Sequence, residues 1–195
     1  FSSAFTILFM FWSITILVRK IAGHEETLTT GSKIAVLGSG LVGSLAFAFT
    51  DSFWFSAVEA EVYAMASFLM AVLFYVGFLW ERDMFKPRGN RWLILIAFII
   101  GLSFGVHFMA LLTIPAIGFL YYFKNIEKIT IKNFILANVI VVAILMFIFK
   151  LLLPYSLTFF AVAEVFFVNS IGLPFNSGTI IAALALIALF YFGLN

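Results

Sequence analysis

The chain is organised around residues 51–65, which read D-S-F-W-F-S-A-V-E-A-E-V-Y-A-M. This stretch carries three carboxylates and no Lys or Arg, and long apolar runs flank it on both sides. A carboxylate at the centre of a bilayer costs roughly 2.5–3.5 kcal/mol on insertion scales. Three carboxylates this close together therefore indicate either a watery location or a chemical function.

The composition of the whole chain is that of a membrane protein. Hydrophobic residues make up 65% of the 195 residues and charged residues only 10%, whereas soluble domains carry about 25% charged residues. The formal net charge is +2, so nucleic acid is not an expected partner. There is no cysteine, and the two histidines lie far apart in sequence. The sequence therefore offers no disulfide, no thiolate site and no spacing typical of a metal site.

Long apolar runs predict an all-α, polytopic transmembrane bundle of about seven spans. They cover residues 1–18, 34–50, 62–80, 92–106, 108–123, 133–153 and a last run that begins at 179. The runs 92–106 and 108–123 are each shorter than the ~20 residues of a full crossing, so they fit two short spans or a re-entrant pair. We expect one transmembrane domain over residues 1–195, a fragment that lacks the N-terminal span or spans and a C-terminal region.

The segment between the last two runs has a different character. Residues 156–168 are almost wholly apolar, are too short to span, and are bounded by Pro154 and Pro174. This pattern predicts a separate helix that lies in or dips into the outer interface. If it crossed the membrane instead, the last span would reverse its direction. Residues 169–178, N-S-I-G-L-P-F-N-S-G, predict a turn-rich outer loop.

Basic residues in the short connections predict the orientation of the bundle. The connections 19–33, 81–91 and 124–132 hold every Lys and Arg except Lys150, and the alternate connections hold none. Seven crossings place these basic connections on one side, which should be the cytoplasmic side. The acidic stretch and His107 then face the extracytoplasmic side.

Each acid of the central stretch has a structural and a functional interpretation. The sequence Ser56-Ala-Val-Glu59 fits a capping box, in which Ser56 accepts from a helix N-terminal amide and Glu59 reaches back. Asp51 either caps a short interfacial turn or takes part in chemistry. Glu61 lies beyond the cap, inside the start of a span with apolar neighbours. An intramembrane acid is by default a functional hypothesis.

Two aromatic residues and one histidine are candidates for substrate binding. Trp54 and Tyr63 either anchor the chain at the membrane interface or form a wall for a sugar ring. His107 interrupts a long apolar run, and the small residues just before it leave room for a ligand. Its side chain either packs between helices or, as a cation or donor, holds a phosphate oxygen.

Three blocks of sequence, in this order, carry a resemblance to a known family. They are D-S-F-W-F-S-A-V-E-A-E-V-Y-A-M at 51–65, G-L-S-F-G-V-H-F-M-A-L-L-T-I-P at 101–115 and E-V-F-F-V-N-S-I-G-L-P-F-N-S-G at 164–178. Together they resemble a bacterial family of membrane proteins that is similar to protein O-mannosyltransferases and belongs among the GT-C glycosyltransferases. The resemblance implies a multi-spanning, GT-C-like enzyme of the bacterial inner (cytoplasmic) membrane, with its site open to the extracytoplasmic side.

The resemblance also implies the reaction and the substrates. The donor is a sugar on a polyprenyl phosphate, and the acceptor is a hydroxyl of an exported protein or glycan. No cofactor is implied beyond this lipid-linked donor, and partner subunits are an open question. Such enzymes carry their catalytic base in an acidic motif after the first span, and we expect that base upstream of this chain. The residues expected at the catalytic centre are Glu61 and Asp51, and those expected to bind substrate are His107, Trp54, Tyr63 and Glu59.

Two other classes of function stay open. A transporter would use Glu61 and His107 as a proton or substrate relay. Such proteins often show two similar halves with interrupted helices, and the sequence shows no such symmetry. A non-catalytic membrane subunit of a larger assembly would use the acids as helix caps only.

Overall fold

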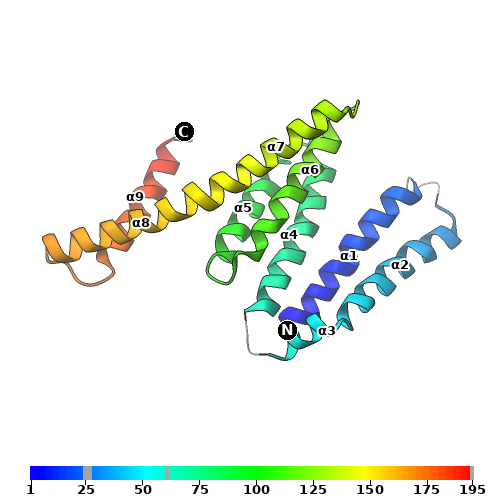
Figure 1. Cartoon of the computed structure of the whole chain (residues 1–195), viewed down its shortest axis with the longest axis horizontal. Coiled ribbons are helices and arrows are strands. Elements are labelled where there is room, and N and C mark those ends of the chain that lie inside the picture. Colours follow the sequence, from blue (N-terminus) through cyan, green and yellow to red (C-terminus); the bar gives the residue numbers. More distant parts are fainter. Residues whose placement is uncertain (24–27, 60–61, 194–195) are drawn as a thin grey trace. The chain divides into compact units, whose positions relative to one another are not determined.

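The computed structural model describes residues 1–23, 28–59 and 62–193, and every regular element in these ranges is helical (Figure 1). The predicted all-α class is therefore confirmed. The elements follow in the order α1 (Ser2–Ala22), α2 (Thr30–Ala48), α3 (Asp51–Val58), α4 (Tyr63–Asp83), α5 (Arg91–Ser103), η2 (Phe108–Leu112), α6 (Thr113–Asn125), α7 (Ile131–Phe147), η3 (Ile148–Leu152), α8 (Leu153–Val165), η4 (Phe166–Ser170) and α9 (Ser177–Gly193).

Five helices in the described part of the chain are long and apolar enough to cross a membrane. They are Ser2–Ala22, Thr30–Ala48, Tyr63–Asp83, Phe108–Asn125 and Ile131–Ser170. Two further predicted spans form shorter apolar helices, Arg91–Ser103 and Ser177–Leu189. A helix as short as α5 is only about 20 Å long, against a hydrocarbon core of about 30 Å. The protein is thus a multi-pass membrane protein, but the count of seven spans is not confirmed.

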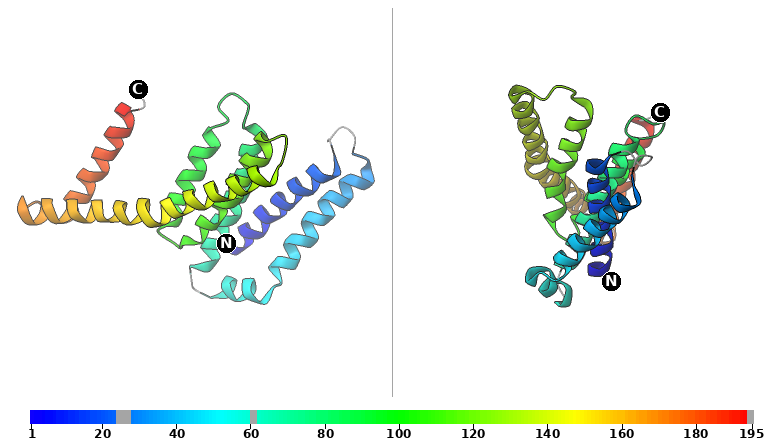
Figure 2. Two further views of the ribbon diagram at one scale, coloured as in Figure 1. Left: turned by 45° about the horizontal axis from the view of Figure 1, so that its top comes forward. Right: turned by 90° about the vertical axis from the view of Figure 1, so that its right-hand side faces the viewer.

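The chain divides into two compact units, Phe1–Val141 and Val142–Asn195. In the first unit α4 is the central helix, because α1, α5, η2 and α6 all contact it (Figures 1 and 2). Helix α2 packs along α1. The buried core of this unit consists of Leu73, Val76, Trp80, Ile96, Ile99, Ala110 and Ile117. The expectation of one transmembrane domain stays a prediction.

Small residues let α1 and α2 approach closely. A Cβ atom added at Gly40 would lie 2.3 Å from the Thr15 hydroxyl, and one at Gly43 would lie 2.9 Å from Ile14. Helices in lipid gain little from burying apolar surface, so close backbone approach and the packing it permits stabilise such pairs. The glycines of α2 therefore contribute to the contact between α1 and α2.

The predicted helix break at Pro154 is wrong. Residues Ile131–Ser170 form one continuous helix of 40 residues. A proline inside a helix removes one backbone donor and its ring clashes with the preceding turn. Here the π-helical turn Ile148–Leu152 comes directly before Pro154, and the wider turn accommodates the ring. The segment 156–168 is consequently the continuation of the preceding helix and has no start of its own.

Candidate functional site

The short helix α3 carries the first part of the acidic stretch. Its N-cap is Thr50, whose hydroxyl donates to the Phe47 carbonyl (2.8 Å) and makes no cap hydrogen bond. Asp51 is the first helical residue, and its exposed carboxylate lies in the first turn, where the helix dipole favours it. The interpretation of Asp51 as the capping residue is therefore wrong, because the helix begins one residue too early for it. Its functional role stays a prediction.

The capping box predicted for Ser56 and Glu59 is also wrong. Helix α3 runs through Ser56, whose hydroxyl donates to the Ser52 carbonyl (2.9 Å) one turn back. A serine inside a helix commonly bonds its own helix in this way, and no new helix begins at Ser56 whose amides it could cap. Glu59 ends α3 in extended backbone with its side chain exposed, and α4 begins only at Tyr63. Glu59 therefore stays a substrate-binding prediction without the structural role.

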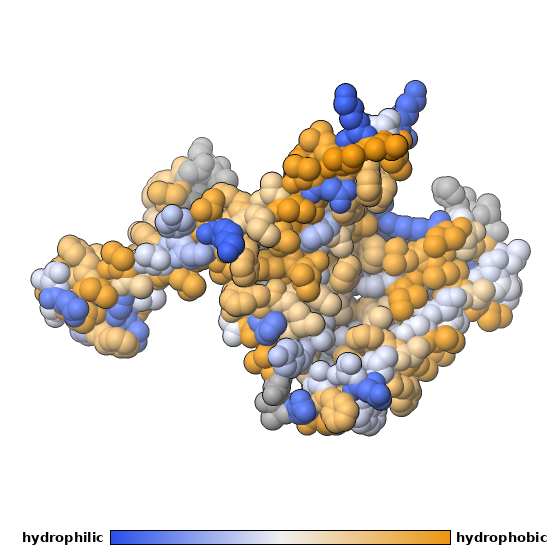
Figure 3. All heavy atoms as spheres, in the orientation of Figure 1, coloured by the Kyte–Doolittle hydropathy of each residue, from blue (hydrophilic) through white to orange (hydrophobic). Residues whose placement is uncertain are grey.

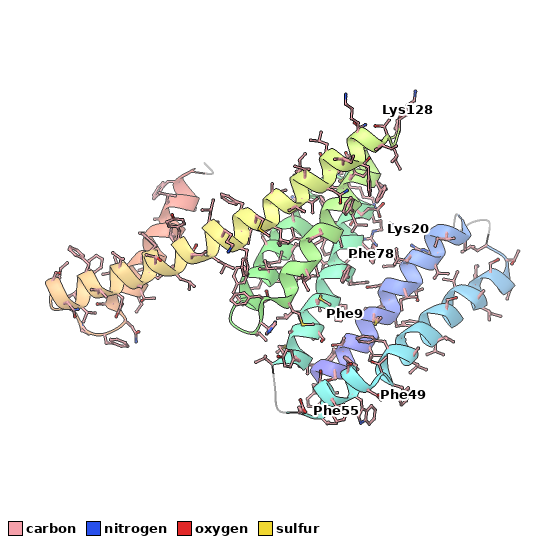
Figure 4. The ribbon with its side chains drawn as sticks, in the orientation of Figure 1. Phe9, Lys20, Phe49, Phe55, Phe78 and Lys128 are labelled. Atoms are coloured by element: carbon pink, nitrogen blue, oxygen red, sulfur yellow. The ribbon has the colours of Figure 1, made fainter. Side chains whose placement is uncertain are left out.

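Helix α3 has one buried aromatic ring, Phe53, and two exposed ones, Trp54 and Phe55. Phe53 is buried and packs against Phe47, with ring centroids 4.7 Å apart. Trp54 is 55% exposed and stacks on Phe49, with centroids 6.1 Å apart. Phe49 and Phe55 mark this end of the first unit in Figure 4. The exposure of Trp54 fits both an interface anchor and a wall for a sugar ring.

Glu61, the acid expected closest to the chemistry, lies outside the described residues. On one side of the undescribed residues 60–61, Glu59 closes α3, and shortly after them Tyr63 opens α4. The segment between them leads from the exposed short helix to the central helix of the first unit. Any role of Glu61 therefore stays a prediction.

Tyr63 and His107, two predicted substrate-binding residues, lie side by side. Their ring centroids are 5.4 Å apart and the rings are tilted by 53°. His107 precedes the 3-10 helix η2, and its Nδ1 accepts a hydrogen bond from the Met109 amide (3.2 Å). Because Nδ1 is the acceptor, the neutral ring carries its proton on Nε2. The half-buried imidazole thus carries an N–H donor, and its ring contacts the ring of Tyr63.

The opposite end of the first unit carries acids that the sequence interpretation did not single out. Glu81 forms ion pairs with Lys20 of α1 and with Lys124 of α6 (3.0 Å to the latter). Lys20 also lies over the Phe78 ring, 5.6 Å from its centroid, and Figure 4 shows both side chains where α1 meets α4. Glu81 therefore joins three helices. The spacing of these residues in sequence gave no signal for this contact.

Asp83 has four donors around one carboxylate. Its oxygens accept from Arg82 Nε and Nη2 (2.9 and 3.0 Å), Lys86 Nζ (2.9 Å) and the Trp92 indole (3.1 Å). The acid is buried, while its two cationic partners are largely exposed. This cluster fixes the turn between α4 and α5. It is structural, because every strong acceptor position on the carboxylate is already used.

In the second unit Glu164 has a structural role. Its carboxylate accepts from the amides of Asn176 (2.6 Å) and Thr179 (2.8 Å) and from the Thr179 hydroxyl (3.0 Å). These amides lie at the start of α9, whose unpaired N–H groups favour an anion. Gly178 permits the approach, since a Cβ there would lie 2.5 Å from the Ala163 carbonyl oxygen. Glu164 therefore holds the N-terminus of α9 on α8.

The remaining features of the described residues give little further chemistry. No group of three or more His, Cys, Asp or Glu among them could hold a metal ion. An apolar hollow of about 420 Å³ opens along α8. It is lined by Tyr155, Thr158, Phe159, Val162, Ala163 and Phe166.

The first two thirds of the chain match a known protein family. The family model described as Protein O-mannosyl-transferase TMEM260 N-terminal domain matches residues 1–130. The match includes the acidic stretch, Tyr63 and His107, and it ends before α7 begins at Ile131. No curated protein matches the chain, and no solved structure does.

Proposed function

The chain belongs to the protein O-mannosyl-transferase TMEM260 N-terminal domain family, and from that premise we propose how an O-mannosyltransferase-like membrane glycosyltransferase of this sequence works. The donor is a sugar on a polyprenyl phosphate. The acceptor is a hydroxyl of an exported protein or glycan. The reaction takes place at the end of the first unit that carries Asp51, Tyr63 and His107, in a GT-C-like enzyme.

The proposed reaction exchanges one bond at the anomeric carbon for another. The acceptor oxygen attacks this carbon, the bond to the phosphate oxygen breaks, and a carboxylate takes the proton of the acceptor hydroxyl. Glu61 and Asp51 position the acceptor or assist this base. The leaving group is a lipid phosphate, whose growing charge needs hydrogen-bond donors in place before the reaction.

The single observation that supports this proposal best is the contact between Tyr63 and His107. The Met109 amide occupies Nδ1 of His107, so the Nε2–H group can donate to a phosphate oxygen. The Tyr63 hydroxyl supplies a second donor close by. Trp54 and Glu59, exposed on and after α3, complete the proposed binding surface for the sugar and the acceptor.

The proposed location follows from the distribution of charge. The basic connections face the cytoplasm of a bacterial inner membrane, as positive residues in short loops do. The acidic end then faces the extracytoplasmic side, where exported acceptors are found. In Figure 4 Lys20 and Lys128 lie toward one end of the first unit, and Phe49 and Phe55 toward the other.

The test is sugar transfer by the purified full-length protein, from polyprenyl-phosphate mannose to a Ser/Thr peptide. We expect His107→Ala to lower the rate by about 10²-fold, as loss of an oxyanion donor does. Glu61→Gln and Asp51→Asn should each lower it roughly tenfold to a hundredfold, which corresponds to one charged hydrogen bond. Tyr63→Phe should give a smaller loss of the same kind.

Matched substitutions at other positions control for folding and for charge. Glu127→Gln removes an exposed acid near the C-terminal end of α6, and His24→Ala removes the second histidine of the chain. Both variants should transfer sugar at the wild-type rate. Wild-type turnover in His107→Ala and Glu61→Gln would remove these residues from the site and with them the proposed mechanism.

A further inference from the structure

Two connections meet at the basic end of the first unit. The α4–α5 connection and the end of α6 touch where the Asn125 amide group donates to the Met84 sulfur (3.2 Å). Lys124 reaches Glu81 of α4 at the same place. The cations on and beside these connections form what we term the basic platform. Its members are Lys86, Arg88, Arg91, Lys128 and Lys132, all of them exposed.

Two of the three described acids beside the platform are already paired within the protein. Glu81 is shared by Lys20 and Lys124, and Asp83 by Arg82 and Lys86. Among the described residues, Arg88, Lys128 and Lys132 form no ion pair with a carboxylate. Glu127 is the remaining described acid of the α6–α7 connection and is exposed. The platform therefore presents a surplus of positive charge to its surroundings.

Large apolar side chains stand among these cations. Phe85 is 71% exposed, Ile129 60% and Ile131 82%. Figure 3 shows hydrophilic side chains projecting from an apolar surface at this end of the first unit, and Figure 4 labels Lys128 there. Exposed apolar residues next to Lys and Arg are typical of surfaces that enter the headgroup layer of a membrane.

We propose that the basic platform binds the phosphate headgroups of anionic phospholipids in the leaflet that it faces. It lies at the C-terminal ends of the spanning helices α4 and α6, which is the depth of the headgroups. The cations contact lipid phosphates, and Phe85, Ile129 and Ile131 enter the acyl boundary. A soluble anion or a nucleic acid would use the cations and leave the apolar side chains in water, so lipid fits both features.

Native mass spectrometry of the delipidated full chain in detergent tests this proposal by counting bound lipids. Phosphatidylglycerol should bind at least tenfold more tightly than phosphatidylcholine, and raised NaCl should weaken only the former. The double variant Arg88→Asn/Lys128→Gln should lose roughly tenfold to thirtyfold of the phosphatidylglycerol affinity. Asn is chosen at position 88 because the backbone there has φ +65°, which Asn tolerates better than most residues.

A second double variant removes the same charge elsewhere. Lys33→Gln/Lys150→Gln takes away two exposed cations outside the platform and should keep wild-type affinity. Phe85→Ser/Ile129→Ser should weaken phosphatidylglycerol binding without changing its salt dependence. Equal binding of the two lipids, equal losses in both charge variants, or displacement of the lipid by inorganic phosphate or by polyuridylic acid would each overturn the proposal.

Discussion

Glu81 is the residue on which three helices of the first unit depend. Glu81 lies on α4, and its side chain is only 12% exposed. Its carboxylate forms ion pairs with Lys20 of α1 and Lys124 of α6. The two lysines are partly exposed, so solvent screens them and each pair alone is worth little. The largely buried carboxylate is different, because removing its charge leaves two cations without the negative charge that they share. Glu81 therefore contributes to the packing of these three helices.

We predict that Glu81→Gln lowers the free energy of unfolding by about 1–3 kcal/mol, the range for loss of a charged hydrogen-bond partner. Thermal unfolding in detergent, followed by tryptophan fluorescence, measures the effect as a lower Tm. Glu127→Gln makes the same chemical change at an exposed acid and should leave Tm unchanged. Equal Tm values for the two variants would show that the shared ion pair contributes nothing to stability.

The α8–α9 hairpin is an element whose geometry depends on one glycine. Glu164 binds the first amides of α9, and Gly178 allows the two helices to touch there. A Cβ at Gly178 would meet backbone atoms of Ala163 and Glu164, two of them at 2.5 Å. Backbone cannot move aside as a flexible side chain can. A methyl group at this position must therefore separate the two helices.

We predict that Gly178→Ala destabilises the hairpin by about 1–3 kcal/mol, as overpacking does. Hydrogen exchange should show it as faster exchange of the amides in the first turns of α9. Gly38→Ala is the control, because nothing lies within 4 Å of a Cβ at Gly38. There the substitution should be neutral or stabilising by about 0.5–1 kcal/mol. Unchanged exchange in Gly178→Ala would mean that α9 is not held at this contact.

The apolar runs were sufficient to predict the helices, because each run is long and carries few charges. They did not predict the ends correctly. Proline at 154 predicts a break, yet a π-helical turn before it keeps the helix continuous. The spacing of Ser56 and Glu59 predicts a helix start, yet both residues belong to a preceding short helix. In each case local backbone geometry decides where the helix begins or ends, and residue types alone do not specify that geometry.

For the first unit as a whole, the sequence predicts the two ends better than it predicts the contacts within them. Counting Lys and Arg in alternate connections separates a basic end from an acidic one. This count does not show that Glu81 forms ion pairs with two lysines or that Tyr63 lies beside His107. Those contacts join residues that are far apart in sequence, so they depend on how the helices pack. The part of the site nearest the expected chemistry, Glu61, lies outside the described residues.

The separation of charge leads to a prediction about the whole molecule in the membrane. The chain has no cysteine, so single cysteines introduced at exposed positions can be labelled without background. In right-side-out bacterial vesicles, a membrane-impermeant maleimide should label Ser52→Cys in α3 at once. It should label Asn90→Cys and Thr130→Cys, in the basic connections, only after permeabilisation. This labelling pattern is expected because positive residues in short loops stay on the cytoplasmic side. Labelling of Ser52→Cys only after permeabilisation would place the acidic stretch in the cytosol, where exported acceptors cannot reach it. The proposed transfer would then have no acceptor on that side, whatever His107 and Tyr63 bind.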